Sequence, residues 1–301
     1  MSTDRRNALL ALTAAGALWG LTIPFSKLAL GWLDPFSLTV ARFALAAPLL
    51  ALVARGTLRG ALSWRVAVWG AVFYGLGVML QNAAVERTSV THAALIVATV
   101  PVFVALFSWM RGRSSATPQA WAGFLLAIVG VGLVAGTGGD DSLAGDALML
   151  ASAVAGGAYV VAQPRVLAGR DPIAVTAVQM AAGALVALPL AGLPTAAPTD
   201  AQLWGFLGLA IAGSLLPFAL YAYGQARVHA ELAGAFVNLE PVVGVAAGVL
   251  AFGNPFGVPQ ALGAILVIAG IGLSAGASGR RGRASSRSRG PSSSSASPRT
   301  A

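Results

Sequence analysis

Apolar residues fill ten long stretches of the chain, and short polar segments separate them. A segment that crosses lipid must satisfy its own backbone hydrogen bonds, and a helix of about 20 apolar residues does so while spanning the bilayer. The pattern therefore predicts an all-α integral membrane protein with ten transmembrane helices. We expect them at residues 8–26, 36–54, 65–84, 92–110, 119–137, 145–163, 172–191, 203–223, 232–252 and 259–277.

The first five stretches resemble the last five at one constant offset in residue number. A repeat with an odd number of spans must enter the membrane in opposite directions in its two copies, and such inverted repeats are common in secondary transporters. We therefore expect one repeat over residues 1–139, an inverted repeat over 140–277, and a tail over 278–301. The offset pairs Trp19 with Tyr159, Pro24 with Pro164, Arg87 with Arg227, and Pro101 with Pro241.

The composition of the chain also indicates burial in lipid. Only 10% of the 301 residues are charged and 57% are hydrophobic, whereas a soluble domain carries about 25% charged residues. The net charge of +9 would otherwise suggest nucleic acid, but six of the 19 basic residues lie in the tail and most others in short loops. We therefore expect no nucleic-acid partner. The tail is too polar to order itself, and it either touches anionic lipid or serves only as a solvated topology anchor.

The basic residues predict the orientation of the spans. With the N-terminus in the cytoplasm, sixteen of the 19 basic residues fall on the inner side, and the exceptions are Lys27, Arg42 and Arg87. The acidic residues Asp34 and Glu86 fall in outer loops. The prediction is a multi-pass protein of the plasma (inner) membrane with both termini inside.

Four motifs together resemble a known family. They are Leu18-Trp-Gly-Leu-Thr-Ile-Pro-Phe-Ser-Lys27, Ala41-Arg42-Phe43, Thr99-Val-Pro-Val-Phe103 and Leu239-Glu-Pro-Val-Val243. This set resembles the EamA family of the drug/metabolite transporter superfamily. The resemblance implies two inverted five-helix repeats around a central cavity formed mainly by spans one, three, four, six, eight and nine. It also implies export of small metabolites, often amino acids, or of toxic compounds.

Glu240 is the first candidate for transport chemistry. It lies near mid-membrane in the predicted span 232–252, where a charge costs about 2.5–3.5 kcal/mol and marks a functional site by default. A carboxyl group there can bind and release a proton, so we expect proton coupling through Glu240. The alternative is a neutral acid that hydrogen-bonds a neighbouring helix and only supports packing beside Pro241.

Two basic residues near the predicted outer side are harder to assign. Arg42 is expected either to reach outward or to pair with a carboxylate such as Asp34 or Glu86, and a direct contact with substrate is the alternative. Lys27 is expected to anchor the end of the first span at the interface.

Four prolines recur at matching places in the two repeats, namely Pro24, Pro101, Pro164 and Pro241. A proline inside a helix removes one backbone hydrogen bond and kinks the helix. We expect these kinks to act as hinges or to line the site, although membrane helices also simply tolerate proline.

Polar and aromatic residues within the apolar spans predict the lining of the cavity, since each must find a partner or face water. Trp19 and Tyr159 occupy equivalent positions and are expected to form opposing aromatic walls. Such a cavity suits neutral, zwitterionic or lipophilic cationic solutes. The polar set comprises Asn82, Thr99, Gln163, Gln179, Asn238, Tyr159 and Tyr223.

Small residues recur as Gly130-x-Gly132-x3-Gly136 and Gly270-x-Gly272-x3-Gly276. This spacing lets helix backbones approach closely, either in a dimer seam or within one subunit. A monomer and a homodimer are therefore both consistent with the sequence.

Signatures of other function classes do not occur in the sequence. No hydrolase elbow, zinc-protease helix or nucleotide loop is present, and with no cysteine and two histidines we expect no metal, no cofactor and no enzyme activity. The sequence thus predicts an alternating-access exporter of small molecules. An ion-independent facilitative uniporter is the main alternative, and a membrane scaffold without transport activity is the second.

Overall fold

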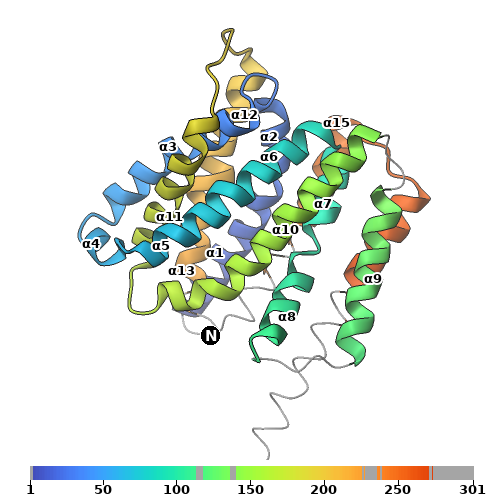
Figure 1. Ribbon diagram of the computed structural model, residues 1–301, viewed down its shortest axis with the longest axis horizontal. Coiled ribbons are helices and arrows are strands. Elements are labelled where there is room, and N and C mark those ends of the chain that lie inside the picture. Colours follow the sequence, from blue (N-terminus) through green and yellow to red (C-terminus); the bar gives the residue numbers. More distant parts are fainter. Residues whose placement is uncertain are drawn as a thin grey trace, which may run out of the picture.

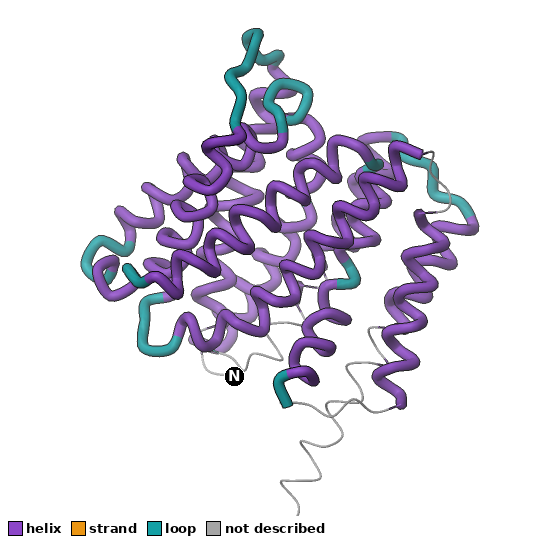
Figure 2. Tube along the Cα trace, in the orientation of Figure 1, coloured by secondary structure: helices purple, strands orange, loops and turns teal. Residues whose placement is uncertain are grey.

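The chain forms a bundle of helices, and the described residues contain no strand (Figures 1 and 2). This computed structural model describes residues 3–112, 118–135, 140–225, 227, 236–237, 239–270 and 273. The tail and the residue Asn238 lie outside this range, so the predictions made for them are not addressed by the fold.

Seven helices in the described part of the chain are long and apolar enough to cross a membrane. They run over Asp4–Ala29, Pro35–Val53, Trp64–Arg87, Val90–Met110, Leu143–Leu167, Pro172–Leu190 and Asp200–Gln225. The remaining predicted spans hold shorter apolar helices, Trp121–Gly130, Leu239–Phe252 and Val258–Gly270. Helix was predicted correctly in each of the ten ranges, while seven of them hold a helix that is long and apolar enough to cross a membrane.

Several spans are divided into consecutive elements. The elements are α1 (Thr3–Gly20), α2 (Thr22–Ala29), α3 (Pro35–Val53), α4 (Leu58–Ala61), α5 (Trp64–Gly70), η1 (Ala71–Gly77), α6 (Val78–Arg87), α7 (Val90–Val97), α8 (Val100–Met110), α9 (Pro118–Ala135), α10 (Asp140–Leu167), α11 (Pro172–Ala187), η2 (Leu188–Leu190), α12 (Asp200–Ala210), η3 (Ile211–Leu215), α13 (Leu216–Gln225) and α15 (Leu239–Phe252).

Two of the recurring prolines lie directly after helix breaks. Helix α1 ends at Gly20, four residues before Pro24, and α7 ends at Val97, four residues before Pro101. In a regular α-helix the carbonyls of Gly20 and Val97 would accept hydrogen bonds from the backbone N–H groups at these two proline positions. Because proline has no N–H to donate, the regular ladder stops at these carbonyls. Pro164, by contrast, lies inside a continuous α10. The break therefore does not recur at its counterpart in the second repeat.

The third and eighth spans each contain a π-helical segment. These segments, η1 and η3, begin at Ala71 and Ile211, which are separated by the same offset as Trp19 and Tyr159. A π-bulge leaves a carbonyl without its usual helical partner and is frequent at functional sites. The segments therefore mark equivalent places in the two repeats where backbone groups are available to other side chains.

Helices α3 and α11 are equivalent in the repeats and pack against each other in antiparallel orientation. Asp34 caps α3 and accepts a hydrogen bond from the Gly192 N–H, at 3.3 Å, just beyond the end of α11 and η2. Asp171 caps α11 and accepts a hydrogen bond from Thr57 Oγ1, at 2.7 Å, just beyond the end of α3. Each N-terminus is thus tied to the loop that follows its partner helix.

The glycines of the fifth and tenth spans meet within one subunit. A Cβ atom at Gly130 would lie 2.7 Å from the Gly263 carbonyl oxygen, and one at Gly270 would lie 2.5 Å from the Gly123 carbonyl oxygen. The two contacts are equivalent, since Gly123 and Gly263 are also separated by the repeat offset. Close packing of α9 on the last helix therefore accounts for Gly130 and Gly270, whereas Gly132 faces open space.

Candidate functional site

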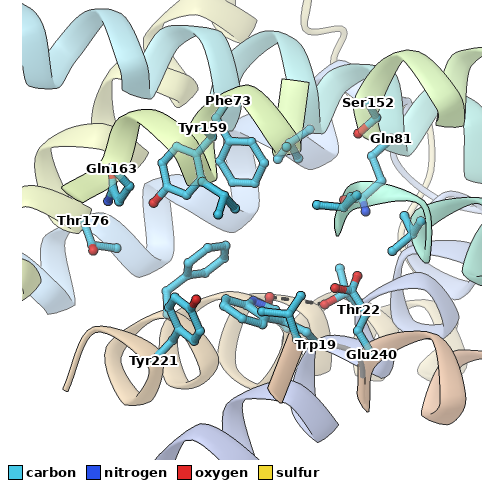
Figure 3. Close-up of a pocket in the computed structure, with 18 of the residues that line it drawn as sticks. Trp19, Thr22, Phe73, Gln81, Ser152, Tyr159, Gln163, Thr176, Tyr221 and Glu240 are labelled. Carbon is cyan, nitrogen blue, oxygen red and sulfur yellow. Dashed lines mark hydrogen bonds between the residues drawn. The ribbon is translucent and has the colours of Figure 1, made fainter. Parts of the chain in front are cut away.

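A cavity of about 130 Å³ lies at the centre of the bundle (Figure 3). It is lined from each of the six spans that the family resemblance implied, and also by Arg42 of α3 and Thr176 of α11. Its aromatic lining residues are Trp19, Phe73, Tyr159, Phe218 and Tyr221, and its polar ones are Thr22, Arg42, Gln81, Ser152, Gln163, Thr176, Gln225 and Glu240.

Aromatic side chains form two opposite walls of this cavity. On one side Tyr159 stacks on Phe73, with ring centroids 4.1 Å apart and planes 14° apart. On the other side Trp19 packs against Tyr221 at 4.9 Å and Phe218 at 5.0 Å. Figure 3 shows Tyr159 and Trp19 facing the cavity from these two sides. The equivalent residues Trp19 and Tyr159 of the two repeats thus lie on opposite sides of the cavity.

Arg42 reaches the cavity as a fully buried cation. Its Nε donates to Ser214 Oγ at 2.9 Å, and its second terminal nitrogen donates to the Gly213 carbonyl at 3.3 Å. The remaining terminal nitrogen has no hydrogen-bond partner among the described residues. Arg42 is only 2% exposed and is one of the residues that line the cavity, and this unpaired nitrogen is itself buried.

Neither of the two placements expected for Arg42 is seen: at 2% exposure it does not reach outward, and among the described residues it forms no ion pair with an acid. Asp34 is used in the cap of α3, and Glu86 lies 2.9 Å from Arg87. Arg42 instead finds its acceptors on η3. The Gly213 carbonyl lacks its usual helical donor because Pro217, four residues later, has no N–H. No local pattern in the sequence indicates this contact, since Ser214 lies 172 residues away.

Glu240 enters the cavity from the first turn of α15. In the described part of the chain no side chain forms an ion pair or a hydrogen bond with its carboxyl group. Figure 3 shows it beside Thr22 and Trp19. A close approach of α1 makes this position possible, because a Cβ atom at Gly20 would lie 2.7 Å from the Glu240 carbonyl oxygen.

A reciprocal amide pair closes the other end of the cavity. Gln163 Nε2 donates to Gln179 Oε1 at 3.1 Å, and Gln179 Nε2 donates to Gln163 Oε1 at 3.0 Å. Tyr159 Oη adds a bond to Gln179 Oε1 at 3.4 Å and lies 3.1 Å from Tyr74 Oη. This network fixes the orientation of the Tyr159 wall. Both amides are therefore satisfied by each other and not left open to a solute.

The cavity thus combines a buried cationic donor, a carboxyl group and two aromatic walls. The described residues contain no group of three or more histidine or acidic side chains that could hold a metal ion. The EamA-like transporter family matches this chain twice, over residues 6–136 and over residues 143–276. The two matches fit the two repeats described above. This chain belongs to the EamA-like transporter family.

Two relatives match this chain over almost their whole length. An uncharacterized transporter of Archaeoglobus fulgidus is 27% identical over 284 residues, covering 90% of this chain and 97% of that protein. The uncharacterized transporter YyaM of Bacillus subtilis is 27% identical over 284 residues, covering 88% of this chain and 92% of that protein. A solved crystal structure matches with a TM-score of 0.67 at 22% identity, covering 91% of this chain and 98% of that one, which bears on the fold alone. This EamA-like chain is therefore a multi-pass membrane transporter.

Three residues predicted for the lining of this transporter lie elsewhere. Asn82 is fully buried and donates from Nδ2 to Thr39 Oγ1 at 2.9 Å, which ties α6 to α3. Thr99 donates to the Ile96 carbonyl at 2.7 Å in the turn between α7 and α8. Tyr223 lies under the Arg227 guanidinium at 3.7 Å. Each of these contacts is structural, and the cavity lining includes none of the three.

Lys27 caps the end of α6. Its Nζ donates to the carbonyls of Val85 at 2.7 Å, Glu86 at 3.1 Å and Thr88 at 2.9 Å. These carbonyls have no partner within the helix. Lys27 therefore joins the first span to the third.

Several lining residues of the transporter were missed from the sequence. Thr22 follows Trp19 by three residues, a spacing that would place both on one face of a continuous helix and was a usable signal, although α1 ends at Gly20 between them. Gln81 is adjacent to Asn82, and only the rotation of α6 decides which of them faces the cavity. Phe73 and Tyr221 carry no signal of their own in an apolar span.

Proposed function

We propose that this EamA-like transporter exports small zwitterionic solutes, such as amino acids, across the plasma membrane by alternating access. The observation that carries this proposal is that Arg42 and Glu240 both line one aromatic cavity, and that one buried terminal nitrogen of Arg42 has no partner among the described residues. A guanidinium is suited to a carboxylate of the solute, while aromatic faces and a carboxylate suit a cationic amine.

Alternating access is supported by the repeat architecture. The antiparallel pairing of α3 with α11 is what an inverted repeat requires, and the π-segments and glycine contacts recur at the repeat offset. Two copies of one shape that enter the membrane in opposite directions can exchange conformations and open a shared site to alternate sides. The loop arginines favour a cytoplasmic N-terminus.

Proton coupling is assigned to Glu240. A carboxyl group inside a membrane bundle without a fixed partner can alternate between its protonated and charged forms as solute binds and leaves. Helix breaks near Pro24 and Pro101, and the proline Pro241 next to Glu240, provide positions at which α2, α8 and α15 can move relative to the rest of their spans. The hinge role of these prolines remains a prediction.

Reconstituted protein tests this function directly. Purified protein in liposomes with an imposed pH gradient is followed for movement of a panel of amino acids and lipophilic cations, in wild type and in Glu240→Gln. We expect gradient-driven movement of amino acids that falls at least tenfold in the variant. Asp200→Asn, at an exposed position, is the matched control and should transport normally.

The other outcomes separate the alternatives. An amino acid transport rate that changes neither with the pH gradient nor with the Glu240→Gln substitution would indicate an ion-independent uniporter. Movement of lipophilic cations alone would assign a drug exporter, which the aromatic walls favour but the buried Arg42 does not. No movement of any panel member would contradict transport of these solute classes.

A further inference from the structure

A second cavity, which we call the arginine pocket, is defined by Arg65, Arg111, Arg165 and Arg170 together with Trp69, Ala162 and Val166. Its volume is about 240 Å³. The arginines come from separate parts of the chain: the first turn of α5, the residue that caps α8, the last turn of α10, and the loop before α11. The fold therefore gathers four cations from four separate segments.

The described residues do not neutralise the positive charge of the arginine pocket. Within the described residues no ion pair involves any of the four arginines. The acid nearest in sequence, Asp171, is already occupied, because it accepts hydrogen bonds from Thr57, from the Ile173 N–H at 2.8 Å and from the Ala174 N–H at 3.3 Å. Four like charges around one hollow repel each other, although solvent weakens that repulsion, and an anion between them would offset it.

The geometry points to a phosphate group as the ligand of the arginine pocket. Guanidinium groups bind phosphate oxygens through paired N–H donors, and a phosphate offers enough oxygens to engage several of them at once. A carboxylate has only two oxygens and would leave part of this donor set unused. We therefore propose that the arginine pocket binds a phosphate-bearing anion.

The position of the arginine pocket favours the headgroup of an anionic phospholipid as the source of that phosphate. All four arginines lie at ends of membrane-spanning helices, at the side that the distribution of basic residues predicts to be cytoplasmic. Basic pockets between helices on that side bind anionic headgroups. Trp69, Ala162 and Val166 supply an apolar wall beside the charges, and a tryptophan is well suited to the level of the headgroups.

The arginine pocket is distinct from the central cavity. The two cavities share no lining residue, although α10 contributes to both, with Tyr159 and Gln163 in one and Arg165 in the other. Ligand binding in the arginine pocket can therefore be measured independently of transport.

Native mass spectrometry of the detergent-purified full chain tests this proposal, with phosphatidylglycerol and phosphatidylcholine as probes. Wild type should retain phosphatidylglycerol in preference to phosphatidylcholine. The variant Arg65→Gln/Arg165→Gln should lose this retention at least tenfold. The control Arg55→Gln/Arg59→Gln removes equal charge from exposed positions outside the pocket and should behave as wild type.

The remaining outcomes are equally decisive. Arg65→Lys/Arg165→Lys keeps the charge but loses the paired donors, so an intermediate loss supports the proposal even if the glutamine variant misfolds. If millimolar inorganic phosphate releases the lipid from wild type, the pocket binds phosphate and a soluble anion replaces the lipid as its source. Equal loss in the pocket and control variants, or no loss in either, would overturn the proposal and reduce the arginines to topology determinants.

Discussion

Arg42 Nε donates a hydrogen bond to Ser214 Oγ at 2.9 Å and thereby joins the second span of one repeat to the π-segment of the other. Ser214 in turn donates from Oγ to the Leu209 carbonyl at 2.9 Å, five residues earlier in the chain. The bulge of η3 therefore positions both acceptors of the guanidinium. One terminal nitrogen of Arg42, a residue that lines the cavity, is left without a partner among the described residues.

Substitution of Arg42 by lysine should weaken solute binding. An ammonium group has the charge but not the fork that contacts Ser214 and Gly213 simultaneously, so we expect the KM for a carboxylate-bearing solute to rise at least tenfold. Uptake into proteoliposomes measures it. Arg55→Lys at an exposed position is the control, and a KM unchanged in Arg42→Lys would assign the residue to packing alone.

The amide pair of Gln163 and Gln179 should behave as one unit in a double-mutant cycle. Replacement of either glutamine by leucine leaves the other amide buried and unpaired, which costs about 1–3 kcal/mol. Replacement of both removes the two amides together, so the double variant should lose less than the sum of the single losses, by about 1 kcal/mol. Reversible unfolding in mixed micelles measures the four free energies of unfolding, and strict additivity would contradict the coupling.

Gly183 should not tolerate alanine. A Cβ atom there would lie 2.6 Å from the backbone carbon of Tyr74 and 2.8 Å from the Gly75 nitrogen, and neither backbone atom can move aside easily. We expect Gly183→Ala to lower the free energy of unfolding by about 1–3 kcal/mol.

Gly132→Ala is the matched control for that change, because no atom lies within 4 Å of its added Cβ. Because alanine favours the helix more than glycine does, the free energy of unfolding of Gly132→Ala should equal that of wild type or exceed it by under about 1 kcal/mol. The same unfolding measurement applies to both variants, and equal losses at the two positions would show that the contact with η1 is not the cause.

Stability should fall in acid through the two capping aspartates. Burial raises the pKa of each, but the hydrogen bonds from Ser37, Phe36 and Gly192 to Asp34, and from Thr57, Ile173 and Ala174 to Asp171, outweigh it and hold each pKa below its ordinary value of 3.8. A lowered folded-state pKa contributes stability that is present above pH 3.8 and is lost as the pH falls through the folded value.

The double variant Asp34→Asn/Asp171→Asn tests the origin of that acid dependence. Asparagine keeps a capping oxygen but cannot titrate, so the variant should lose less stability than wild type between neutral pH and the region below pH 3.8. Thermal melts across this range measure the difference. An identical acid profile in both proteins would place the dependence on other carboxyl groups.

Much of the fold was predictable from residues near each other in sequence. Lipid forces every span to bond its own backbone, so composition alone located helices in ten ranges, and the constant offset between matching residues revealed the repeat. The N-caps Asp34 and Asp171 and the breaks at Gly20 and Val97 likewise depend on neighbours within a few positions.

The lining of the cavity was only partly predictable. Trp19, Tyr159, Gln163, Arg42 and Glu240 were identified as chemically unusual residues and do line it. Gln81 and Asn82 show the limit, because consecutive residues point about 100° apart on a helix. A span that is apolar on nearly every side gives no clue to which direction faces the cavity.

The sequence by itself therefore determined the helices and their repetition, since these follow from local hydrogen bonding in lipid and from the apolar pattern, and its motifs carried the resemblance to the family that was then matched. Only the tertiary structure decided the partner of Arg42, the continuity of α10 through Pro164 and the gathering of four arginines in one pocket. These features depend on the rotation and packing of helices whose contacting residues lie far apart in the chain, and no local pattern records that relationship.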